Sequence, residues 1–398
     1  MLETKDKQNI IFYYSSRIGI NTGRGGAYYS MLAHRKQLMS VYNTLLLHQN
    51  SLSHSTILDG MEDLVYGKGS VFNSLFKVYS FFSSKRPAVF FSYSNRDFTI
   101  YIRFLCKLFN CKYIYVKAGG PNYLLNQYFS NVIFFMKENL DHCKGKGYKN
   151  AFLISNRVDP VNVNYERLNQ FDLSNYSEFI KILRVSRINK VYKEVFEATI
   201  NQHIALQNKG IRVLTHLVGY PEDSEVTAFL TDKVKDIKDI DLLTEDKYTV
   251  NAVDLIPLYD IIVGIGRGFW EAVSLNKFVL GYTNNCSYPI LVNEDNISTF
   301  KEYNFSARVR VSAPEPFLDS LSVYYDHNLN KSYRNGMSKE FEQNYSTKNL
   351  QKKLLISIAE SDSEKFKYLI KTLGMFISGV LKSNYHKIRG KIKFVLQI

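Results

Sequence analysis

Residues 254–283 read DLIPLYDIIVGIGRGFWEAVSLNKFVLGYT, and this stretch decides the fold that we expect. The apolar run 261–265 is typical of a buried parallel strand, the glycine-rich 266–268 of a tight turn, and 269–275 of a helix. A second apolar run follows at 278–282. The pattern therefore predicts a strand, loop, helix and strand in a parallel α/β sheet.

Such a unit presents backbone N–H groups and the positive end of a helix at the carboxyl edge of the sheet, where phosphates bind. Gly266 and Gly268 would let a ligand approach the backbone closely, and Arg267 adds a cation. Glu271 is unfavourable beside phosphates but can accept two hydrogen bonds from a ribose diol. The alternative is an ordinary helix start with a glutamate favoured by the helix dipole and a surface arginine, and this stretch alone does not choose between them.

A second set of basic residues follows another expected strand, 180–185. Arg187, with Lys190 or Lys193, leaves this strand at the edge where the glycine-rich segment also emerges. Two cations beside a helix N-terminus suit a diphosphate, whose charge one cation would leave partly uncompensated. The sequence does not choose between the two lysines.

The first half of the chain offers a similar arrangement. A strand at 9–16 leads through a glycine-rich loop to a helix at 27–40, a second candidate site for anionic or hydroxyl groups. The loop does not read GxGxxG, which argues against an NAD fingerprint. Gly119, Gly120 and Asn122 end another strand and offer polar groups at the sheet edge, although the pattern by itself favours an ordinary strand-to-helix turn.

Strands and helices alternate through the rest of the chain, as in parallel sheets covered on both faces. Further strands are expected at 42–48, 88–93, 112–117, 132–136, 151–154, 212–219 and 240–243. Further helices are expected at 72–82, 98–109, 314–328 and 347–359, and one more after residue 193 that ends at 209. A polar segment, 156–177, breaks the pattern and predicts a domain crossing. We therefore expect an α/β protein with two Rossmann-like doubly wound domains, residues 1–160 and 161–361, followed by a tail, 362–398.

The tail differs in character from the rest of the chain. Its apolar residues recur at three- and four-residue steps, and from Lys365 onward it holds eight Lys or Arg residues and no acidic one. A basic amphipathic helix suits an anionic membrane surface, which predicts such a partner for Lys365–Lys393. The alternative is a last helix packed on the body with a solvated basic face.

Composition limits the function further. The chain has 398 residues, 45% of them hydrophobic, which is enough for two cores of ordinary size. The first ten residues lack the apolar core of a signal peptide, and no apolar run reaches the ~18 residues that span a bilayer, so we expect a cytoplasmic protein. The net charge of +14 concentrates in the tail, and no nucleic-acid-binding motif is present, which argues against a nucleic-acid partner.

These features together resemble a known family. The glycine-rich loop after the first strand, RINK at 187–190, a strand ending in Gly219, and GIGRGFWEA at 264–272 followed by FVL are similar to the retaining GT-B glycosyltransferases of family 4. KAGGPN at 117–122 is similar to the corresponding stretch of bacterial polysaccharide transferases. The resemblance implies two domains facing each other across a cleft, an N-terminal acceptor domain and a C-terminal donor domain.

The resemblance also implies roles for individual residues. Arg187 and Lys190 or Lys193 would hold the donor diphosphate, and Glu271 the nucleotide ribose. The remaining positions would contact the donor or the acceptor: Gly25, Gly26, Gly119, Gly120, Asn122, Gly219, Gly266, Arg267 and Gly268. The implied reaction moves a sugar from a nucleotide-diphosphate sugar to a hydroxyl of a growing, lipid-linked capsule or O-antigen type glycan of a bacterium. It would proceed with retention, without a metal or a cofactor, on the inner face of the cytoplasmic membrane.

Two other functions fit parts of the pattern. A GT-B nucleotide-sugar epimerase would use the same donor site. A non-catalytic scaffold would use the basic tail to recruit partners to a membrane and would bind no nucleotide sugar. Binding of nucleotide sugars separates the scaffold from the two enzymes.

Overall fold

The computed structural model describes residues 7–16, 26–50, 63–66, 71–93, 99–120, 129–144, 148, 150–155, 157–312 and 314–363. The chain forms two compact units. Unit 1 takes its described residues from 1–135, 139–154 and 351–398, and unit 2 from 136–138 and 155–350. The sequence analysis assigned 161–361 to the second domain, whereas the structure places residues 351–363 with unit 1.

Unit 1 is built on a seven-stranded sheet in the order β3-β2-β1-β4-β5-β6-β7, in which every pair is parallel. Its strands are β1 (Asn9–Ser16), β2 (Asn43–Asn50), β3 (Leu64–Tyr66), β4 (Val89–Ser92), β5 (Lys112–Lys117), β6 (Asn131–Phe134) and β7 (Asn150–Leu153). Its helices are α1 (Gly26–Leu38), α2 (Val71–Lys85), α3 (Thr99–Leu108), α4 (Lys137–Cys143), which begins at the unit boundary, and α13 (Leu350–Glu360).

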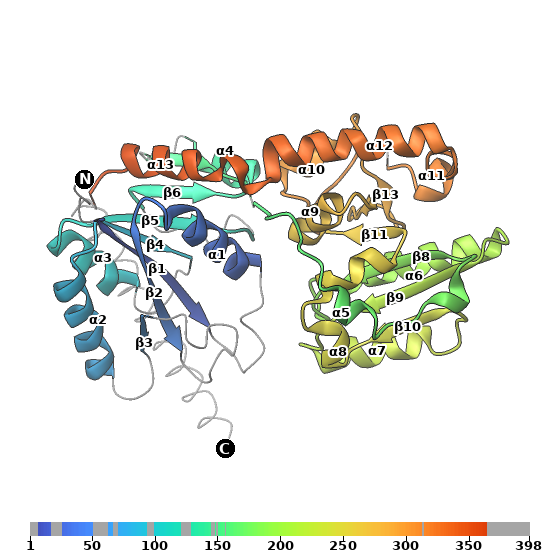
Figure 1. Cartoon of the computed structure of the whole chain (residues 1–398), viewed down its shortest axis with the longest axis horizontal. Helices are drawn as coiled ribbons and strands as arrows, with labels where there is room; N and C mark the ends of the chain where they lie inside the picture. The colour runs from blue at the N-terminus through green and yellow to red at the C-terminus, as the bar shows by residue number, and fades with distance from the viewer. Residues whose placement is uncertain are drawn as a thin grey trace, which may run out of the picture. The chain divides into compact units, whose positions relative to one another are not determined.

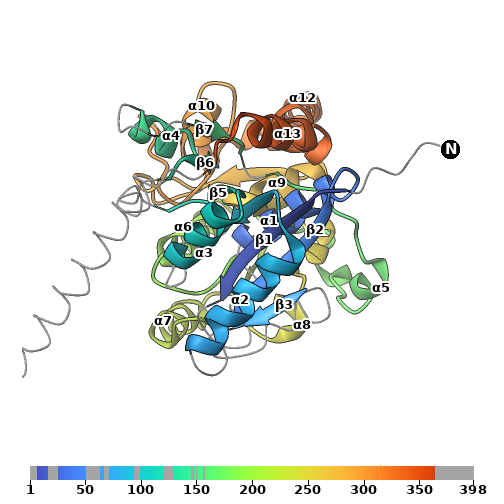
Figure 2. The same ribbon diagram turned by 90° about the vertical axis from the view of Figure 1, so that its left-hand side faces the viewer.

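Apolar side chains on one face of this sheet pack against α2 and α3. Tyr13, Phe90 and Tyr113 of three adjacent strands join Phe82 of α2 and Ile102 of α3 in one buried cluster. The aromatic rings of Phe82, Phe90 and Tyr113 stack in sequence, with centroids 5.5 and 5.9 Å apart. In Figures 1 and 2, α2 and α3 lie side by side along this face. The strands need apolar residues on both faces because helices cover both.

Helix α13 returns to unit 1 from the far end of the sequence. At its start, the Gln351 side chain donates to the Gln37 carbonyl oxygen at 2.8 Å. Near its end, Lys112 Nζ donates to the Ile358 carbonyl oxygen, also at 2.8 Å. The Asn131 side chain donates to the carbonyl oxygen of Asp362, just beyond the helix. Hydrogen bonds to α1, β5 and β6 therefore hold the helix on unit 1.

Unit 2 contains a six-stranded sheet in the order β10-β9-β8-β11-β12-β13, of which only the pairing of β12 with β13 is antiparallel. Its strands are β8 (Ile180–Val185), β9 (Val213–Val218), β10 (Ile240–Leu243), β11 (Ile261–Gly264), β12 (Phe278–Gly281) and β13 (Ile290–Leu291). Its helices include α5 (Tyr165–Leu168), α6 (Lys193–Asn208), α7 (Ser224–Val234), α8 (Asp246–Thr249), the 3-10 helix η3 (Ala252–Leu258), α9 (Gly266–Ser274), α10 (Ile297–Glu302), α11 (Leu321–Tyr325) and α12 (His327–Glu340).

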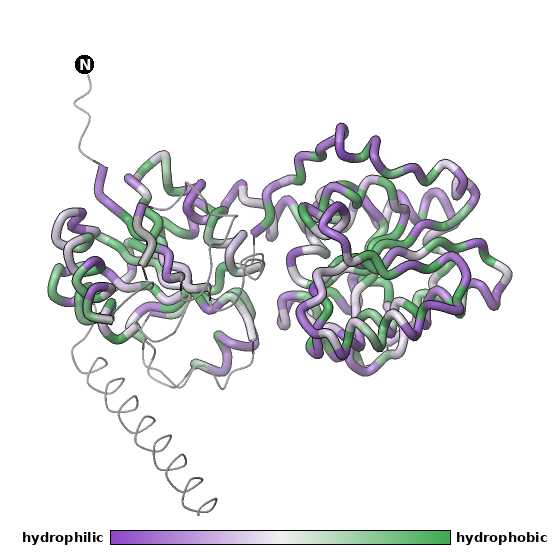
Figure 3. The backbone as a smooth tube through the Cα atoms, turned by 90° about the horizontal axis from the view of Figure 1, so that it is seen from below, coloured by the Kyte–Doolittle hydropathy of each residue, from purple (hydrophilic) through white to green (hydrophobic). Residues whose placement is uncertain are grey.

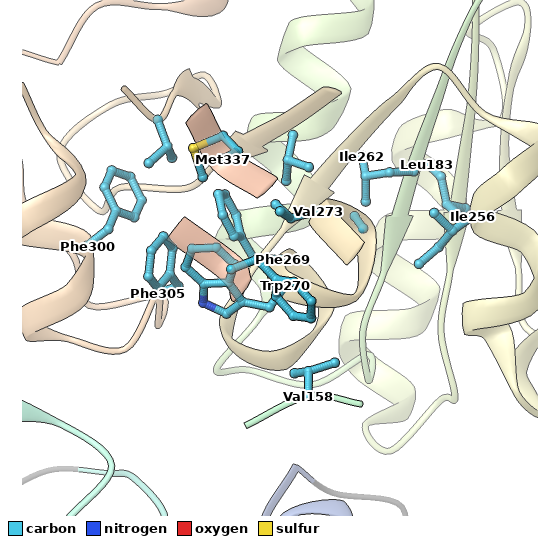
Figure 4. Packing of buried hydrophobic residues seen from close by; sticks show 14 of the residues in the cluster. Val158, Leu183, Ile256, Ile262, Phe269, Trp270, Val273, Phe300, Phe305 and Met337 are labelled. Carbon is cyan, nitrogen blue, oxygen red and sulfur yellow. The ribbon is translucent and has the colours of Figure 1, made fainter. Parts of the chain in front are cut away.

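Helix α9 is anchored by aromatic residues in the core of unit 2. Phe269 and Trp270 are fully buried and pack against Phe305, with ring centroids 4.5 and 4.8 Å away (Figure 4). Trp270 also stacks on Tyr345 at 3.8 Å. In Figure 3, the hydrophobic residues of this unit gather in its central strands. The buried aromatic pair fixes the direction in which α9 leaves the sheet.

The two doubly wound α/β units confirm the predicted fold class, and four predicted strands (9–16, 112–117, 180–185 and 240–243) have the observed bounds. The helix expected at 314–328 is wrong. The chain there forms a 3-10 turn and the short α11, which ends at Tyr325. A separate helix, α12, begins at His327. Asp326 breaks the helix because its backbone is extended and its side chain caps α12.

Three parts of the predictions lie outside the described residues: the tail from residue 364, Gly25 and Asn122. Among the helices that the structure does describe, none is both long and apolar enough to cross a membrane.

Candidate functional site

The carboxyl ends of neighbouring strands meet at one edge of the unit 2 sheet. The register pairs Arg184 of β8 with Val263 of β11, and Val185 of β8 with Val218 of β9. The segments that follow these strands therefore emerge together, because parallel strands in register end at the same edge. They are 186–190, 219–223 and 265–268, which bring Arg187, Lys190, Gly219 and Gly266–Gly268 to one edge, as the sequence analysis expected.

Arg187 contacts an acidic neighbour from the next loop. Its Nη1 lies 3.1 Å from Oε1 of Glu222, whose other oxygen accepts from the Asn189 side chain at 2.8 Å. The guanidinium also lies over the Tyr192 ring, 5.7 Å from its centroid. Burial lowers the pKa of Arg187, but Tyr192 and Glu222 outweigh it, so the net shift is upward. The group stays a cation and faces a carboxylate in this structure.

The two candidate lysines have different surroundings. Lys190 is largely exposed, and its Nζ lies 3.4 Å from a carboxylate oxygen of Glu225 and 3.9 Å from one of Asp223. Lys193 opens α6, and its Nζ lies 3.7 Å from the centroid of the Phe229 ring on α7. Lys190 therefore shares the acidic segment that also binds Arg187, whereas Lys193 makes a cation–π contact.

The sequence analysis missed this acidic segment, residues 222–225. Asp223 caps α7 by accepting from the backbone N–H groups of Glu225 and Val226. The sequence could have predicted the start of this helix, since an aspartate directly before a polar helix is a common N-cap. Helix α7 itself escaped prediction because it buries only Val226, Leu230 and Val234.

The second part of the site is the start of α9, which differs from the prediction. The helix begins at Gly266 and includes the three residues expected to form a turn. Gly266 has φ +51°, a conformation that favours glycine, and its N–H already donates to the Phe305 carbonyl oxygen at 2.6 Å. A Cβ added at Gly268 would meet nothing within 4 Å. Glycine at 268 is therefore not required by packing within the chain.

Arg267 and Glu271 bind each other across one turn of this helix. Arg267 Nε donates to Glu271 Oε1 at 2.6 Å, and both side chains are about four-fifths buried, with 19% and 18% exposed. Arg267 Nη1 also donates to the backbone carbonyl oxygen of Arg157 at 3.5 Å. The predicted ribose ligand and the predicted cation are thus brought together as a hydrogen-bonded ion pair.

Two other glycines at this edge have packing roles. A Cβ at Gly219 would lie 2.2 Å from the carbonyl oxygen of Ser186, and a Cβ at Gly264 would lie 2.6 Å from Cα of Phe269. The first glycine lets the segment after β9 approach the segment after β8, and the second lets α9 turn tightly off β11. Gly219 therefore has an explanation within the chain, and Gly264 is a position that the sequence analysis did not single out.

Unit 1 holds the remaining predicted residues that are described. Gly119 and Gly120 follow β5 with φ +149° and +81°, and the Asn139 side chain donates to the Gly120 carbonyl oxygen at 3.4 Å. The buried Lys117 donates to the Gly119 carbonyl oxygen. Gly26 is the first residue of α1. The two positive φ angles explain the glycine pair by backbone conformation.

A buried cation also lies below the edge of unit 2. Arg184 of β8 is 1% exposed, donates through Nη1 to the Val263 carbonyl oxygen at 2.8 Å, and lies over Phe196 of α6. Its Nε and Nη2 have no hydrogen-bond partner among the described residues. Burial lowers its pKa to about 10, which still leaves it charged at neutral pH. It adds positive charge beneath the segment that carries Arg187.

No known family model and no curated protein matches the sequence. Solved structures do match the fold. A glycosyltransferase from Rickettsia africae has a TM-score of 0.63 at 16% identity, over 89% of this chain and 99% of that one. Anabaena HepE in complex with UDP and glucose has a TM-score of 0.63 at 12% identity, over 88% and 99%.

An epimerase also shares the fold. The UDP-GlcNAc 2-epimerase from Neisseria meningitidis, bound to UDP-GlcNAc, has a TM-score of 0.53 at 12% identity, over 89% of this chain and 100% of that one. Identities this low establish likeness of fold. The chain therefore has the GT-B fold, two doubly wound α/β units, as the resemblance in its sequence predicted.

Proposed function

We propose that the protein is a glycosyltransferase that takes a sugar from a nucleotide-diphosphate sugar. The observation that carries this proposal is the carboxyl edge of unit 2, where Arg187, Lys190 and the start of α9 follow adjacent parallel strands. An edge with two cations, a buried Arg184 beneath them and a helix N-terminus suits a diphosphate. Glu271, one turn into α9, is suited to a ribose diol.

The roles of these residues follow from the charge that develops in the reaction. As the bond between the sugar and the diphosphate breaks, negative charge grows on the departing phosphate. Arg187, with Lys190 or Lys193, would stabilise that charge, and so would the N-terminus of α9. A preorganised cation of this kind is worth about 100-fold to 1,000-fold in rate.

The finer features of the reaction are part of the same proposal. The sugar is transferred with retention, without a metal, to a hydroxyl held by unit 1, and the departing phosphate accepts the proton of that hydroxyl. Gly119, Gly120 and Asn122 follow β5, and Gly25 and Gly26 lead into α1, so both segments follow strands of the unit 1 sheet. We propose that these segments contact the acceptor and the donor.

The acceptor that we propose is a growing, lipid-linked surface glycan of a bacterium. The basic tail supports this setting, because eight Lys or Arg residues without an acid favour an anionic bilayer surface. The protein would then act in the cytoplasm at the inner face of the membrane.

Epimerisation of a nucleotide sugar is a second candidate, because an epimerase shares the fold with a TM-score of 0.53. The glycosyltransferase from Rickettsia africae matches with a higher TM-score of 0.63, which favours transfer. The two reactions differ in their products: a transferase releases the nucleoside diphosphate and joins the sugar to another molecule, whereas an epimerase returns an intact nucleotide sugar with one inverted carbon.

Donor binding and turnover test the proposal. Titration calorimetry with UDP, the nucleotide bound to HepE, is the first measurement, followed by other nucleoside diphosphates and by product analysis with each nucleotide sugar. Arg187→Ala is expected to weaken binding, with Arg212→Ala as the matched control, since Arg212 is exposed and pairs with Glu178 before β9, at the opposite edge. Separate Lys190→Ala and Lys193→Ala variants decide which lysine contributes. Failure of every nucleoside diphosphate to bind would reject the proposal.

A further inference from the structure

Two neighbouring helices of unit 1 expose large apolar side chains on their outer surface. On α2 these are Phe72, Phe76 and Tyr79, which are 84%, 69% and 42% exposed. On α3 they are Phe104 and Leu108, which are 46% and 56% exposed. We name this surface the α2–α3 face. Exposure of such large apolar side chains to water is unfavourable in free energy, and exposed apolar patches mark binding surfaces.

The spacing of these residues makes them a continuous stripe on each helix. Phe72, Phe76 and Tyr79 recur at steps of four and three, and Phe104 and Leu108 are four apart, so each set lies on one side of its helix. The opposite sides of the same helices are buried in the unit 1 core. Both helices are therefore apolar on two sides, and folding of unit 1 covers only one of them.

The two stripes belong to one surface because the helices pack side by side (Figure 2). The hydroxyl of Tyr101 on α3 donates to the Leu75 carbonyl oxygen on α2 at 2.9 Å. Farther along, the Tyr79 ring lies 5.9 Å from the ring of Phe109, directly after α3. Contacts at both ends of α3 therefore hold it against α2.

The exposed charges of the two helices have one sign. Neither α2 nor α3 contains Asp or Glu, while Lys77, Lys85 and Lys107 lie on them and are exposed, and Arg86 follows α2. Arg103, the other basic residue of α3, is buried over Phe129 and does not contribute. Exposed aromatic residues among lysines, without acids, form the pattern by which interfacial helices bind anionic lipid bilayers.

Charge complementarity also decides between possible occupants. A second copy of this face would set lysine against lysine, and the tail from Lys365 onward is itself basic, so both would be repelled. An anionic phospholipid surface supplies the opposite charge and an apolar layer for the phenylalanines. We propose that the α2–α3 face docks unit 1 on an anionic membrane, with Phe72 and Phe76 inserted below the lipid headgroups.

This surface is separate from the donor edge of unit 2 and from the basic tail, and lipid binding can be measured without any sugar donor. If the proposed transferase function holds, the face would keep unit 1 at the surface where a lipid-linked acceptor resides. Absence of vesicle binding by a wild-type protein that still binds nucleotide would reject the docking face alone, so the two proposals can fail separately.

The test uses the full chain and sedimentation with phosphatidylcholine vesicles that contain or lack phosphatidylglycerol. The double variant Phe72→Ser/Phe76→Ser is expected to weaken binding to the anionic vesicles by at least about tenfold, since each buried apolar group contributes to the partition. Its matched control, Tyr325→Ser/Leu329→Ser, removes two exposed apolar side chains of unit 2. Melting curves check that both variants remain folded.

Charge reversal and a fluorescent reporter sharpen the result. Lys77→Glu/Lys107→Glu is expected to lower the affinity for anionic vesicles about tenfold or more, whereas Lys331→Glu/Lys339→Glu on α12 is expected to leave it unchanged. The only tryptophan, Trp270, is buried, so Phe76→Trp reports on the face. Its emission should shift to the blue on vesicles and be quenched by brominated lipid, in contrast to Tyr325→Trp.

Three results would overturn the proposal. Equal binding of wild type and Phe72→Ser/Phe76→Ser would assign any membrane contact to another part of the chain. Absence of vesicle binding by the wild type would leave the face to a protein partner. Phe76→Trp emission that does not respond to vesicles would show that the face stays in water.

Discussion

The charged side chains in the two parts of the candidate site have partners from different places. After β8, Arg187 and Lys190 bind carboxylates from a different part of the chain, the acidic segment 222–225 at the start of α7. On α9, Arg267 and Glu271 bind each other within a single turn. Arg187 and Lys190 become available to a ligand when the acidic segment 222–225 moves away. The second part releases its carboxylate only when the pair within the helix opens or shares its hydrogen bonds with a ligand.

This difference separates two contributions to donor binding. The segment after β8 offers positive charge that an incoming diphosphate takes over from Glu222, so its contribution is electrostatic and should fall as salt rises. The α9 pair offers a fixed, mostly buried carboxylate whose position Arg267 maintains, so its contribution should depend on the ribose hydroxyls. Each prediction below tests one side of this comparison.

The largest effect is expected for Arg187→Ala. Removal of the cation should lower kcat by about 100-fold to 1,000-fold because charge on the departing phosphate loses its main partner. Steady-state assays of nucleoside diphosphate release measure this loss. Arg212→Ala, at the opposite edge of the sheet, should stay within twofold of the wild type, and equal effects of both variants would contradict the assignment.

Glu271→Gln should weaken nucleotide binding by about 10-fold to 100-fold, the range for a hydrogen bond to a charged group. The loss should vanish for inorganic pyrophosphate, which has no ribose, when both ligands are titrated by calorimetry. Glu178→Gln is the control, because Glu178 pairs with Arg212 away from the site. An equal loss for pyrophosphate would place Glu271 at the phosphates instead.

The glycines of the α9 part separate packing from ligand contact. Gly264→Ala should lower the free energy of unfolding by about 1–3 kcal/mol, because its Cβ would lie 2.6 Å from Phe269 Cα. Gly336→Ala, inside α12 with open space around it, should raise stability by about 0.5–1 kcal/mol. Chemical denaturation measures both. A stable Gly264→Ala protein would show that α9 can move off β11.

Gly268→Ala should leave stability unchanged or slightly higher, since a Cβ there meets nothing within 4 Å. Nucleotide affinity should nevertheless fall by about tenfold if the ligand lies against this backbone. Thermal melting and calorimetry on the same sample separate the two outcomes. Undiminished affinity would place the ligand away from the first turn of α9.

The smallest effect is expected for Glu222→Gln. This change removes the carboxylate that competes for Arg187 but keeps an oxygen that can accept from Asn189. Diphosphate affinity should rise by about twofold to fivefold, since a partly exposed ion pair contributes less than about 1 kcal/mol. The gain should shrink at high salt. Weaker binding would indicate that Glu222 orders the loop rather than competing with the ligand.

The sequence predicted the strands best where apolar runs are bounded by clear breakers. β5 and β8 have the expected bounds because each is a buried run between polar or glycine-containing segments. β3 and β13 have three and two residues, too few for a periodic signal. Their pairing depends on neighbouring strands, which a linear pattern does not contain.

For the site, the sequence singled out Arg187, Arg267 and Glu271 as candidates, but it could not give their partners. The Arg267–Glu271 pair follows helical spacing and was within reach, because residues four apart on a helix are neighbours. The pairing of Arg187 with Glu222 joins residues 35 positions apart and depends on how two loops meet. Gly264 and Gly219 likewise owe their importance to backbone approaches that only the three-dimensional structure reveals.

The return of α13 to unit 1 has a consequence for the order of folding. During synthesis, residues 155–350 are translated before the residues that bond to Gln37, Lys112 and Asn131. Unit 1 therefore gains its last helix only after all of unit 2 has been translated. Unit 2 can complete its core before α13 docks, whereas the segments of unit 1 that precede residue 155 must wait for a helix that lies beyond unit 2.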